Sequence, residues 1–349
     1  MKYFTPPLYC YVCSHPIKVK KWLSSKAKGM AIAECSCCQY PVINGIYYLK
    51  QMSHQSREKV LRLLQSGNYF GAMMALVQER KKLKIMYYFL LHPRLTAVTK
   101  HISFSMLTRA LTLVEPTSKP WFDYLKHRFQ RVSHYIALHT TSYIKKGDAV
   151  LDVGCGLGHF LHVAGHHQSA TNYVGADISF SFLLLARRYL VDPPVPLVCA
   201  DLDNDLPFAP RTFNTIYFND SFMYFKHQQQ VLVQLAFTLK QTGLLFLNHV
   251  HQRGYQNLGE GHSLSLSHLR RITGHMQAWI NSDKNIFTAI FNTEKVIYRS
   301  LSETKKVDCQ SFSVILTKKI SRLPFYVPPR WLQHQLSSQI DFTEEDYLH

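Results

Sequence analysis

Two groups of residues in this chain have types and spacings that could do chemistry. The first is a pair of C-x-x-C motifs, Cys10 with Cys13 and Cys35 with Cys38. Four thiolates at this spacing can close a tetrahedral site, and closed Cys₄ sites are usually structural zinc sites. Cys37 is a further thiol that can compete as a ligand. A redox role would need only one such pair, so the two motifs predict structural zinc.

The second group is a glycine turn after a short apolar run with one acid in it, 150–153. Three glycines alternate with other residues in Gly154-Cys-Gly-Leu-Gly158. Glycine allows positive φ and a close approach of backbone to ligand, which a strand-to-helix turn at a ligand site needs. The dinucleotide fingerprint G-x-G-x-x-G would place its third glycine at His159, so the spacing departs from it.

The elements around this turn alternate between strand and helix, which predicts a doubly wound parallel sheet. Strands are expected over 150–153, 172–177, 197–200, 213–218 and 243–248, with a terminal antiparallel strand over 311–317 and helices from 159 and over 181–190 and 228–239. Three acids, Asp152, Asp177 and Asp201, lie at or just after the ends of successive strands. Ligand-binding groups of such sheets gather at the carboxyl ends of the strands.

The turn with Asp152 two residues before its first glycine resembles motif I of class I S-adenosylmethionine (SAM) methyltransferases, in a type 11-like domain. The stretch 201–208, DLDNDLPF, followed by 213–216, FNTI, resembles the third-strand loop of that family and its sequel. Asn214 replaces the family's usual aspartate. The resemblance covers residues 145–250 and implies a mostly parallel, seven-stranded, Rossmann-like sheet.

The resemblance also implies which residues bind the cofactor SAM. Asp152 and Asn219 would hold the methionine end of SAM, and Asp177 would hold the ribose. Asp201 and the Leu202 amide would contact the adenine. The glycines of the turn, Gly154, Gly156 and Gly158, would bring their backbone close to the ligand. A lone Asp at such a position is more often a capping carboxylate. Several acids in this order after the turn favour binding.

Absent motifs narrow the reaction. The residues 219–222, NDSF, lack the N/D-P-P-Y/F/W motif, which disfavours methylation of adenine N6. No Pro-Cys or Thr-Cys pair ends the fourth or fifth strand, which disfavours cytosine-C5 chemistry through a cysteine. A histidine could remove the acceptor's proton near neutral pH. The candidate catalytic residues are His227, His249 and His251, with Asp220 and Tyr224 nearby, although each is individually more often a surface or packing residue.

The run 40–49 after the cysteines resembles the zinc ribbon of the small activator protein that partners several RNA and protein methyltransferases. A similar ribbon precedes the catalytic domain of bacterial 23S rRNA guanine-N1 methyltransferases. A domain of this size has little core of its own, so the metal would supply folding energy.

We expect four regions: a zinc ribbon (1–50), a helical basic segment (51–140), the methyltransferase domain (141–320) and a tail (321–349). Within the second region, helical stretches are expected over 57–65 and 69–89, and a helix from Pro120 through Ala137. Gly254 and 259–261 are expected to form a lid loop.

The net charge of +18 is concentrated before the glycine turn. Residues 1–148 hold 23 Lys and Arg against six acids, whereas residues 149–349 hold 17 against 16. This asymmetry favours a polyanionic partner, most often RNA, while simple solubility is the plainer interpretation. Methylation of a small molecule, lipid or sugar intermediate is the alternative, and a non-catalytic adaptor that binds SAM and zinc is a second one.

The location is expected to be cytoplasmic. Met1–Leu8 has no apolar core of a signal peptide. The longest fully apolar run, 85–91, is far shorter than the roughly 20 residues that span a bilayer. Five of the eight cysteines lie within the first 38 residues at metal-ligand spacing, which suggests reduced thiols rather than disulfides.

Overall fold

The computed structural model describes residues 7–24, 29–114, 119–169, 171–193, 195–204, 206–254, 261–307, 309–319, 327–329 and 331–332. These form two compact units. The N-terminal unit comprises Met1–Phe129, Gly156–His159 and Ala176–Asp201, and the C-terminal unit comprises Gln130–Cys155, Phe160–Gly175 and Leu202–His349. Residues 259 and 260 of the expected lid, and most of the expected tail, lie outside the described residues.

The N-terminal unit begins with an antiparallel meander that carries the cysteines. Its strands are β1 (Leu8–Tyr9), β2 (Pro16–Trp22), β3 (Ala31–Glu34), β4 (Gln39–Ile43) and β5 (Ile46–Tyr48). The last of these pairs in parallel with β8 (Leu197–Cys199), with Tyr47 opposite Val198. The ribbon is therefore joined to β8 by main-chain pairing.

Side chains strengthen this junction. Arg187, on α9 (Phe180–Tyr189), donates from Nε to the carbonyl of Asn44 at 3.0 Å. The ring of Tyr48 packs edge-on to Phe180 at 5.5 Å between centroids. The meander thus packs against α9 in the α/β part of the same unit.

The middle segment is helical, as expected, but in shorter pieces. The helices are α1 (His54–Gln65), α2 (Tyr69–Leu76), α3 (Lys81–Leu91), α4 (Thr96–Thr99), α5 (Phe104–Val114) and α6 (Lys119–His127). The prediction of one helical stretch over 69–89 is wrong, because Val77 and Arg80 adopt extended backbone. The prediction of one helix through Ala137 is also wrong, because extended Arg131 separates α6 from α7 (Val132–His139).

The C-terminal unit holds a mixed sheet with the order β6-β9-β10-β13-β11-β12. Its strands are β6 (Ala149–Val153), β9 (Phe213–Asn219), β10 (Leu239–His251), β13 (Ser311–Thr317), β11 (Gln277–Ser282) and β12 (Arg299–Ser300). The first three run parallel, and β13 lies antiparallel between β10 and β11. The strand β7 (Asn172–Asp177) continues from this unit into the other. The antiparallel strand expected over 311–317 is therefore confirmed, and β11 beyond it was not predicted.

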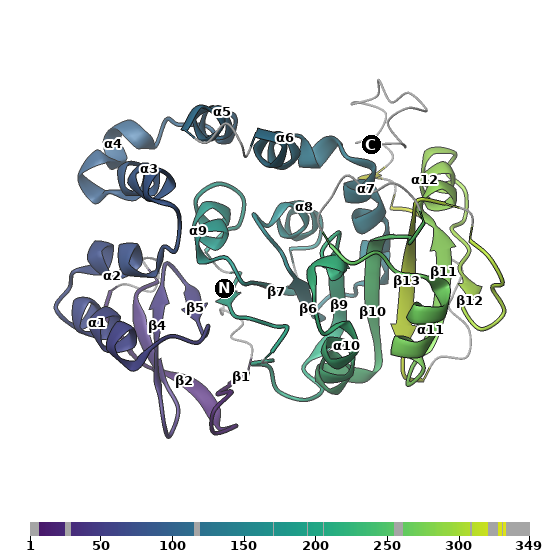
Figure 1. Ribbon diagram of the computed structural model, residues 1–349, viewed down its shortest axis with the longest axis horizontal. Coiled ribbons are helices and arrows are strands. Elements are labelled where there is room, and N and C mark those ends of the chain that lie inside the picture. Colours follow the sequence, from purple (N-terminus) through teal and green to yellow (C-terminus); the bar gives the residue numbers. More distant parts are fainter. Residues whose placement is uncertain are drawn as a thin grey trace. The chain divides into compact units, whose positions relative to one another are not determined.

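Helices cover both sides of this sheet (Figure 1). On one side α7 packs against α12 (Asp283–Phe291), and on the other α10 (Gln228–Thr238) packs against α11 (Leu266–Thr273). Aromatic rings fill the core, with Tyr217 stacked on Phe246 at 4.9 Å. Among the described residues, no helix is long and apolar enough to cross a membrane.

Asn214, the residue that departs from the family pattern, lies at the start of β9 beside β6. Its Oδ1 accepts hydrogen bonds from the Ala149 amide at 3.0 Å and from Lys240 Nζ at 2.8 Å. A neutral amide thus still anchors the start of β6, as a carboxylate at this position would. The substitution concerns the edge of the core.

Candidate functional site

The glycine turn has the backbone that its sequence predicts. Gly154, Gly156 and Gly158 have φ of +69°, +53° and +79°. A Cβ at Gly154 would lie 2.7 Å from Ser221 Cβ, and one at Gly158 would lie 2.3 Å from Val191 Cγ2. A Cβ at Gly156 would meet nothing within 4 Å. Two of the glycines are therefore required by packing, and the middle one leaves open space beside the backbone.

The helix α8 (His159–His167) starts directly after this turn. His159 occupies the position where a dinucleotide site would have glycine. It is 6% exposed, its Nε2 lies 3.2 Å from the carbonyl of Leu125, and the Phe129 ring packs edge-on to it at 4.7 Å. This side chain belongs to the core of the N-terminal unit, which is inconsistent with a backbone–pyrophosphate approach at this point.

Asp177 is fixed beside the turn within the N-terminal unit. Its Oδ2 accepts a hydrogen bond from the Gly156 amide at 2.8 Å, and its Oδ1 accepts one from the Ser179 amide at 2.8 Å. Burial raises the pKa of this carboxyl, while the amide hydrogen bonds oppose the rise. Each oxygen keeps a second lone pair that could accept a further hydrogen bond. Asp201 follows β8 and is half-buried, and Leu202, the first residue of the next C-terminal segment, is buried.

In the C-terminal unit a chain of polar side chains crosses the carboxyl ends of three neighbouring strands. Asp152, on β6, is 1% exposed and accepts at Oδ1 from Asn219 Nδ2 at 3.0 Å. Asn219, on β9, accepts in turn from Asn248 Nδ2 on β10 at 2.9 Å. The Oδ1 atom of Asn248 is buried and has no hydrogen-bond partner within the described residues. Sequence reasoning placed Asp152 and Asn219 here and missed Asn248.

The structure places His227 apart from the other two candidate catalytic histidines, beside Asp203. His227 precedes α10, and its backbone amide donates to Asp203 Oδ1 at 2.8 Å. Its side chain is 57% exposed and lies 3.6 Å from the same carboxylate oxygen. Asp203 thus fixes the backbone of Lys226 and His227 just before α10, and the His227 side chain lies beside the same carboxylate.

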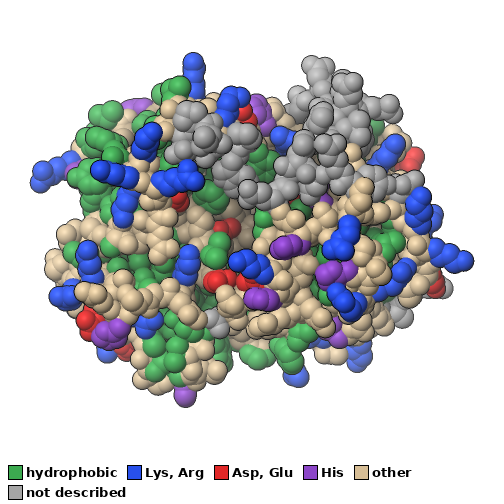
Figure 2. All heavy atoms as spheres, viewed as in Figure 1, with side chains coloured by type: hydrophobic (Ala, Val, Ile, Leu, Met, Phe, Trp, Pro, Cys, Tyr) green, Lys and Arg blue, Asp and Glu red, His purple; other side chains and the backbone are tan. Residues whose placement is uncertain are grey.

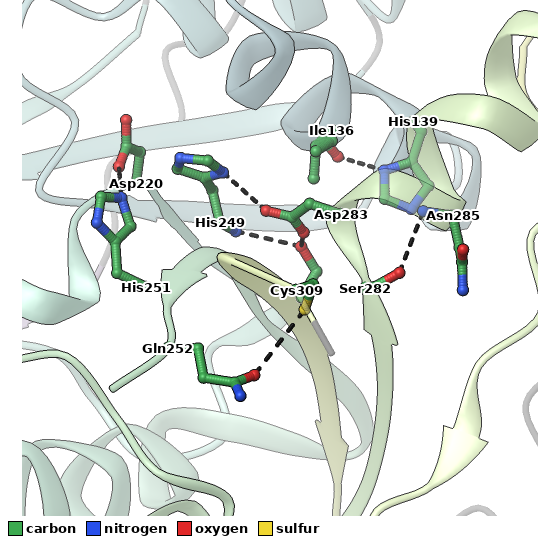
Figure 3. Close-up of polar contacts among 11 residues, drawn as sticks. Ile136, His139, Asp220, His249, His251, Gln252, Ser282, Asp283, Asn285 and Cys309 are labelled. Carbon is green, nitrogen blue, oxygen red and sulfur yellow. Dashed lines mark hydrogen bonds and ion pairs between the residues drawn. The ribbon is translucent and has the colours of Figure 1, made fainter. Parts of the chain in front are cut away.

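His249 and His251 lie together near the end of β10 (Figure 3). Their ring centroids are 5.0 Å apart, and His251 Nε2 is 3.9 Å from Asp220 Oδ1. One ligand atom each from Asp220, His249 and His251 fall within 4.8 Å of one another. We call these three residues the histidine cluster.

A second carboxylate, that of Asp283, contacts the His249 ring. The Nδ1 atom of His249 is 2.7 Å from Asp283 Oδ2, and Asp283 is 4% exposed. Asp283 Oδ1 accepts from Ser313 Oγ at 2.7 Å, and that Oγ accepts from the His249 amide at 3.1 Å. Sequence reasoning missed Asp283 and Ser313. The only local signal was Ser282-Asp283, which has the form of a helix start, and Ser282 is indeed the N-cap of α12.

The cysteines of the ribbon form a second cluster, in the N-terminal unit. Sulfur–sulfur distances are 3.6 Å for Cys10–Cys37, 3.7 Å for Cys13–Cys35 and 3.7 Å for Cys35–Cys37. A tetrahedral zinc ion with Zn–S bonds of about 2.3 Å holds its sulfurs about 3.8 Å apart. The observed distances match that geometry. The compact set of four contains Cys37, and Cys38 Sγ lies 3.3 Å from Cys37 Sγ; we call the set of four the cysteine cluster.

The contacts of the cysteine cluster favour the thiolate at Cys13 but not at every sulfur, because the contact with Cys13 raises the pKa of Cys37 and burial raises the pKa of Cys35. The hydrogen bond with Ser36 Oγ lowers the pKa of Cys13 to about 5. The Tyr40 hydroxyl lies 3.0 Å from Cys10 Sγ. The amides of Val12 and Cys38 each donate to a cysteine sulfur at 3.3 Å. Amide-to-sulfur hydrogen bonds of this kind hold the ligands of a metal site in position.

Comparison with known proteins finds similarity to methyltransferases in the α/β part of the chain. Residues 151–247 match the family described as "Methyltransferase domain". The malonyl-[acyl-carrier protein] O-methyltransferase of Priestia megaterium is 24% identical over 119 residues, which are 34% of this chain and 43% of that protein. The match therefore spans less than half of the curated relative.

Solved structures show weaker likenesses. A complex of the Haloferax volcanii Trm112 methyltransferase activator with a methyltransferase is 17% identical, covers 58% of this chain and 98% of that chain, and has a TM-score of 0.42. The plantazolicin methyltransferase BpumL is also 17% identical, covers 61% and 96%, and has a TM-score of 0.43. Scores below 0.5 support no conclusion about substrate or partner. The strand order and the match over residues 151–247 agree on the Rossmann-like α/β fold of SAM-dependent methyltransferases.

Proposed function

We propose that this protein transfers the methyl group of SAM to a nucleophilic atom of a structured RNA. The observation that carries the enzyme proposal is the row of hydrogen-bonded side chains Asp152, Asn219 and Asn248 at the carboxyl ends of three strands. The glycine turn follows Asp152 closely in the sequence, and a Cβ at its Gly156 would meet nothing within 4 Å. Sites of doubly wound sheets lie at this edge.

The residues present fit the chemistry of SAM. A carboxylate as buried as Asp152 is stable when a positive group pairs with it, and the ammonium of the methionine part would do so. Asn248 Oδ1 is a buried acceptor with no partner among the described residues, suited to the same polar end. The carboxylate of Asp177 is held by two amides with lone pairs left for a ribose diol.

When bound, SAM supplies an activated methyl group on a sulfonium. The protein's task is to hold the acceptor in line with the methyl–sulfur bond, since this chemistry gains mainly from proximity and orientation. Fixed carboxylates and backbone positions, rather than mobile surface groups, suit that task. The strand-end residues named above are of this fixed kind.

The histidine cluster is proposed to face the acceptor. Because Asp283 engages Nδ1 of His249, we assign the other ring nitrogen, Nε2, to the substrate side. A histidine placed in this way can take the acceptor's proton or orient the acceptor. We assign these roles to His249 and His251, and we leave His227 outside the site because its contacts are with Asp203.

The cysteine cluster is proposed to bind structural zinc through Cys10, Cys13, Cys35 and Cys37. The sulfur–sulfur distances and the amide-to-sulfur hydrogen bonds support this assignment. A closed site with four thiolates leaves no position for a substrate. The metal would therefore stabilise the ribbon and its pairing with β8.

The RNA proposal rests on one face of α3. Lys81, Lys82, Ile85, Tyr88 and Phe89 are exposed, and their spacing of three and four places them on one side of the helix. Figure 2 shows Lys and Arg side chains among hydrophobic ones over the helices of this unit. Cations attract phosphates and exposed rings stack on bases, so the combination suits RNA segments with unpaired bases.

Salt-dependent binding tests the RNA proposal. The affinity for a stem-loop RNA should fall linearly with salt on a logarithmic scale. Lys82→Gln should reduce the slope by about one, and Phe89→Ala should weaken binding about fivefold or more. Lys284→Gln, an exposed lysine of the other unit, should change neither. A slope that is flat with salt contradicts the proposal.

Labelled methyl transfer tests the enzyme proposal. Purified protein is incubated with methyl-tritiated SAM and extracts of cells that lack the gene, so that acceptor sites are unmodified. Label in the RNA fraction is expected. Label confined to small molecules or lipids would replace RNA with that substrate class. Failure to bind SAM at all would rule out the enzyme and leave only an adaptor that keeps zinc.

A further inference from the structure

We propose that the histidine cluster, Asp220, His249 and His251, binds one divalent transition-metal ion at the acceptor side of the domain. The site is separate from the cysteine cluster, which belongs to the other unit. The cation site itself is argued from geometry. The role that we give it, holding the methyl acceptor, rests on the proposed function.

The ligand chemistry favours a metal such as Zn²⁺, Fe²⁺, Co²⁺ or Mn²⁺. Two imidazoles and one carboxylate on one side leave further coordination positions open. The three ligand atoms lie within 4.8 Å of one another. Metal–ligand distances of about 2.0–2.2 Å require them to come about 3 Å apart, a change within the reach of small side-chain rotations.

The carboxylate that contacts His249 is of the kind that metal-bound histidines have. Such a histidine almost always gives its other ring nitrogen to a carboxylate or carbonyl, which fixes the tautomer. Here Asp283 Oδ2 lies 2.7 Å from Nδ1, and Ser313 fixes the other oxygen of Asp283. Figure 3 shows the His249 ring with Asp283 at one edge and its opposite edge turned toward the side of Asp220 and His251.

The backbone is held in a demanding conformation at two of the three ligands. Asp220 has φ of +58° and His249 has φ of +59°, although neither is glycine. Left-handed backbone at a non-glycine residue is disfavoured and persists where its surroundings enforce it. The Asp220 amide is tied to the Asn248 carbonyl at 3.0 Å, and the β10–β13 register shifts between Leu247 and Val250. This bulge brings His249 next to His251.

A metal here would serve the acceptor in two ways. An oxygen or nitrogen of the acceptor could occupy an open coordination position and be oriented there. A bound cation also lowers the pKa of such a group, so its proton can leave to water before the methyl arrives. In that arrangement His249 is a ligand, and it no longer needs to take the proton itself.

Manganese binding to the full-length protein tests this inference. Mn²⁺ prefers oxygen and nitrogen ligands to thiolates, so its spin-resonance signal reports the histidine cluster rather than the cysteine cluster. One bound equivalent is expected in the wild type. His251→Ala should weaken binding more than tenfold, and Asp283→Asn should weaken it about tenfold to 100-fold through His249.

The controls keep the result interpretable. His162→Ala removes an exposed histidine of the same unit and should leave Mn²⁺ binding unchanged. His251 is half-buried, so its alanine variant should remain folded by circular dichroism even if a His249 variant does not. Wild type without bound Mn²⁺ or Co²⁺, or a folded His251→Ala with unaltered affinity, overturns the site.

Calorimetry with SAM separates this inference from the proposed function. His251→Ala should bind SAM with the affinity of the wild type, because the cluster is assigned to the acceptor. SAM binding without any metal at the cluster would overturn the inference and leave the methyltransferase proposal standing. Metal binding without SAM binding would overturn the methyltransferase proposal, and with it the acceptor role of the metal.

Discussion

The cysteine cluster and the histidine cluster are both sets of metal-ligand residues, but they are built in different ways. The cysteine cluster uses two short knuckles, 10–13 and 35–38, on neighbouring turns of one meander. The histidine cluster unites Asp220 after β9 with two residues of β10, and it depends on Asp283 at the start of α12. The first is encoded by local spacing and the second by the topology of a sheet.

This difference has consequences for stability. The meander is small, although it buries side chains such as Tyr40, Ile43 and Ile46, so ligands that cross-link its two knuckles would add to its folding energy. The sheet of the C-terminal unit has a core of aromatic and aliphatic residues that does not depend on the histidines. We therefore expect the cysteine cluster to govern folding and the histidine cluster to govern activity.

Removing a cysteine ligand should produce the largest loss of stability. Cys37→Ser should release the metal and lower the free energy of unfolding by about 4 kcal/mol or more, because the cross-link of the meander is lost. Urea unfolding, with elemental analysis of bound zinc, measures both effects. Cys38→Ser is the matched control and should keep the zinc, since Cys38 lies outside the compact set of four. Zinc lost from Cys38→Ser and kept in Cys37→Ser would reverse the ligand assignment.

The same contrast between local and long-range encoding decides which strands could be predicted from the sequence. The strands over 172–177 and 311–317 have the predicted bounds, because apolar, β-rich runs between turns specify buried strands. β10 begins at Leu239, earlier than the predicted 243, because its polar start, Lys240-Gln-Thr, has no strand signal of its own.

The sites follow the same division. Two C-x-x-C motifs predict a thiolate cluster, but the choice between two adjacent thiols, Cys37 and Cys38, depends on how the knuckle folds. Asp283 lies 34 residues beyond its partner His249, and no local pattern connects them. Pairing across a sheet is a long-range property, which is why this part of the site was missed.

The glycine turn offers a second test, with a smaller expected effect, because Gly158 packs against a distant residue and Gly156 does not. Gly158→Ala should lower the free energy of unfolding by about 3 kcal/mol, because the new Cβ would clash with Val191 in a left-handed backbone. Gly156→Ala should cost about 1 kcal/mol, since its Cβ would meet nothing within 4 Å. Urea unfolding of both variants measures the difference. Equal losses in the two variants would show that the left-handed backbone, and not the clash with Val191, determines the loss of stability.

The buried His139 of the C-terminal unit should make the free energy of unfolding fall at acidic pH, by less than the losses expected for Cys37→Ser and Gly158→Ala. Burial lowers the pKa of His139 to about 4, from 6.5. The unfolded state therefore binds the proton more readily, and stability is retained above pH 6.5 and lost as pH falls toward 4. Between pH 7 and pH 5 the loss from this residue should be about 2 kcal/mol.

Urea unfolding at the two pH values, compared with His139→Gln, isolates that contribution. The variant should be less stable at pH 7 but lose about 2 kcal/mol less on going to pH 5. Identical losses in both proteins would show that other groups control the acid response.

Titration calorimetry with SAM decides whether the strand-end residues of the domain bind the cofactor. We expect one SAM site per chain, with the affinity reduced at least tenfold in the nearly isosteric variant Asp152→Asn, because the buried charge that pairs with the ammonium is lost. Asp192→Asn, an exposed acid of the other unit, should bind as the wild type does. Absence of binding at high micromolar SAM, or equal affinity of wild type and Asp152→Asn, would show that these residues do not form a SAM site.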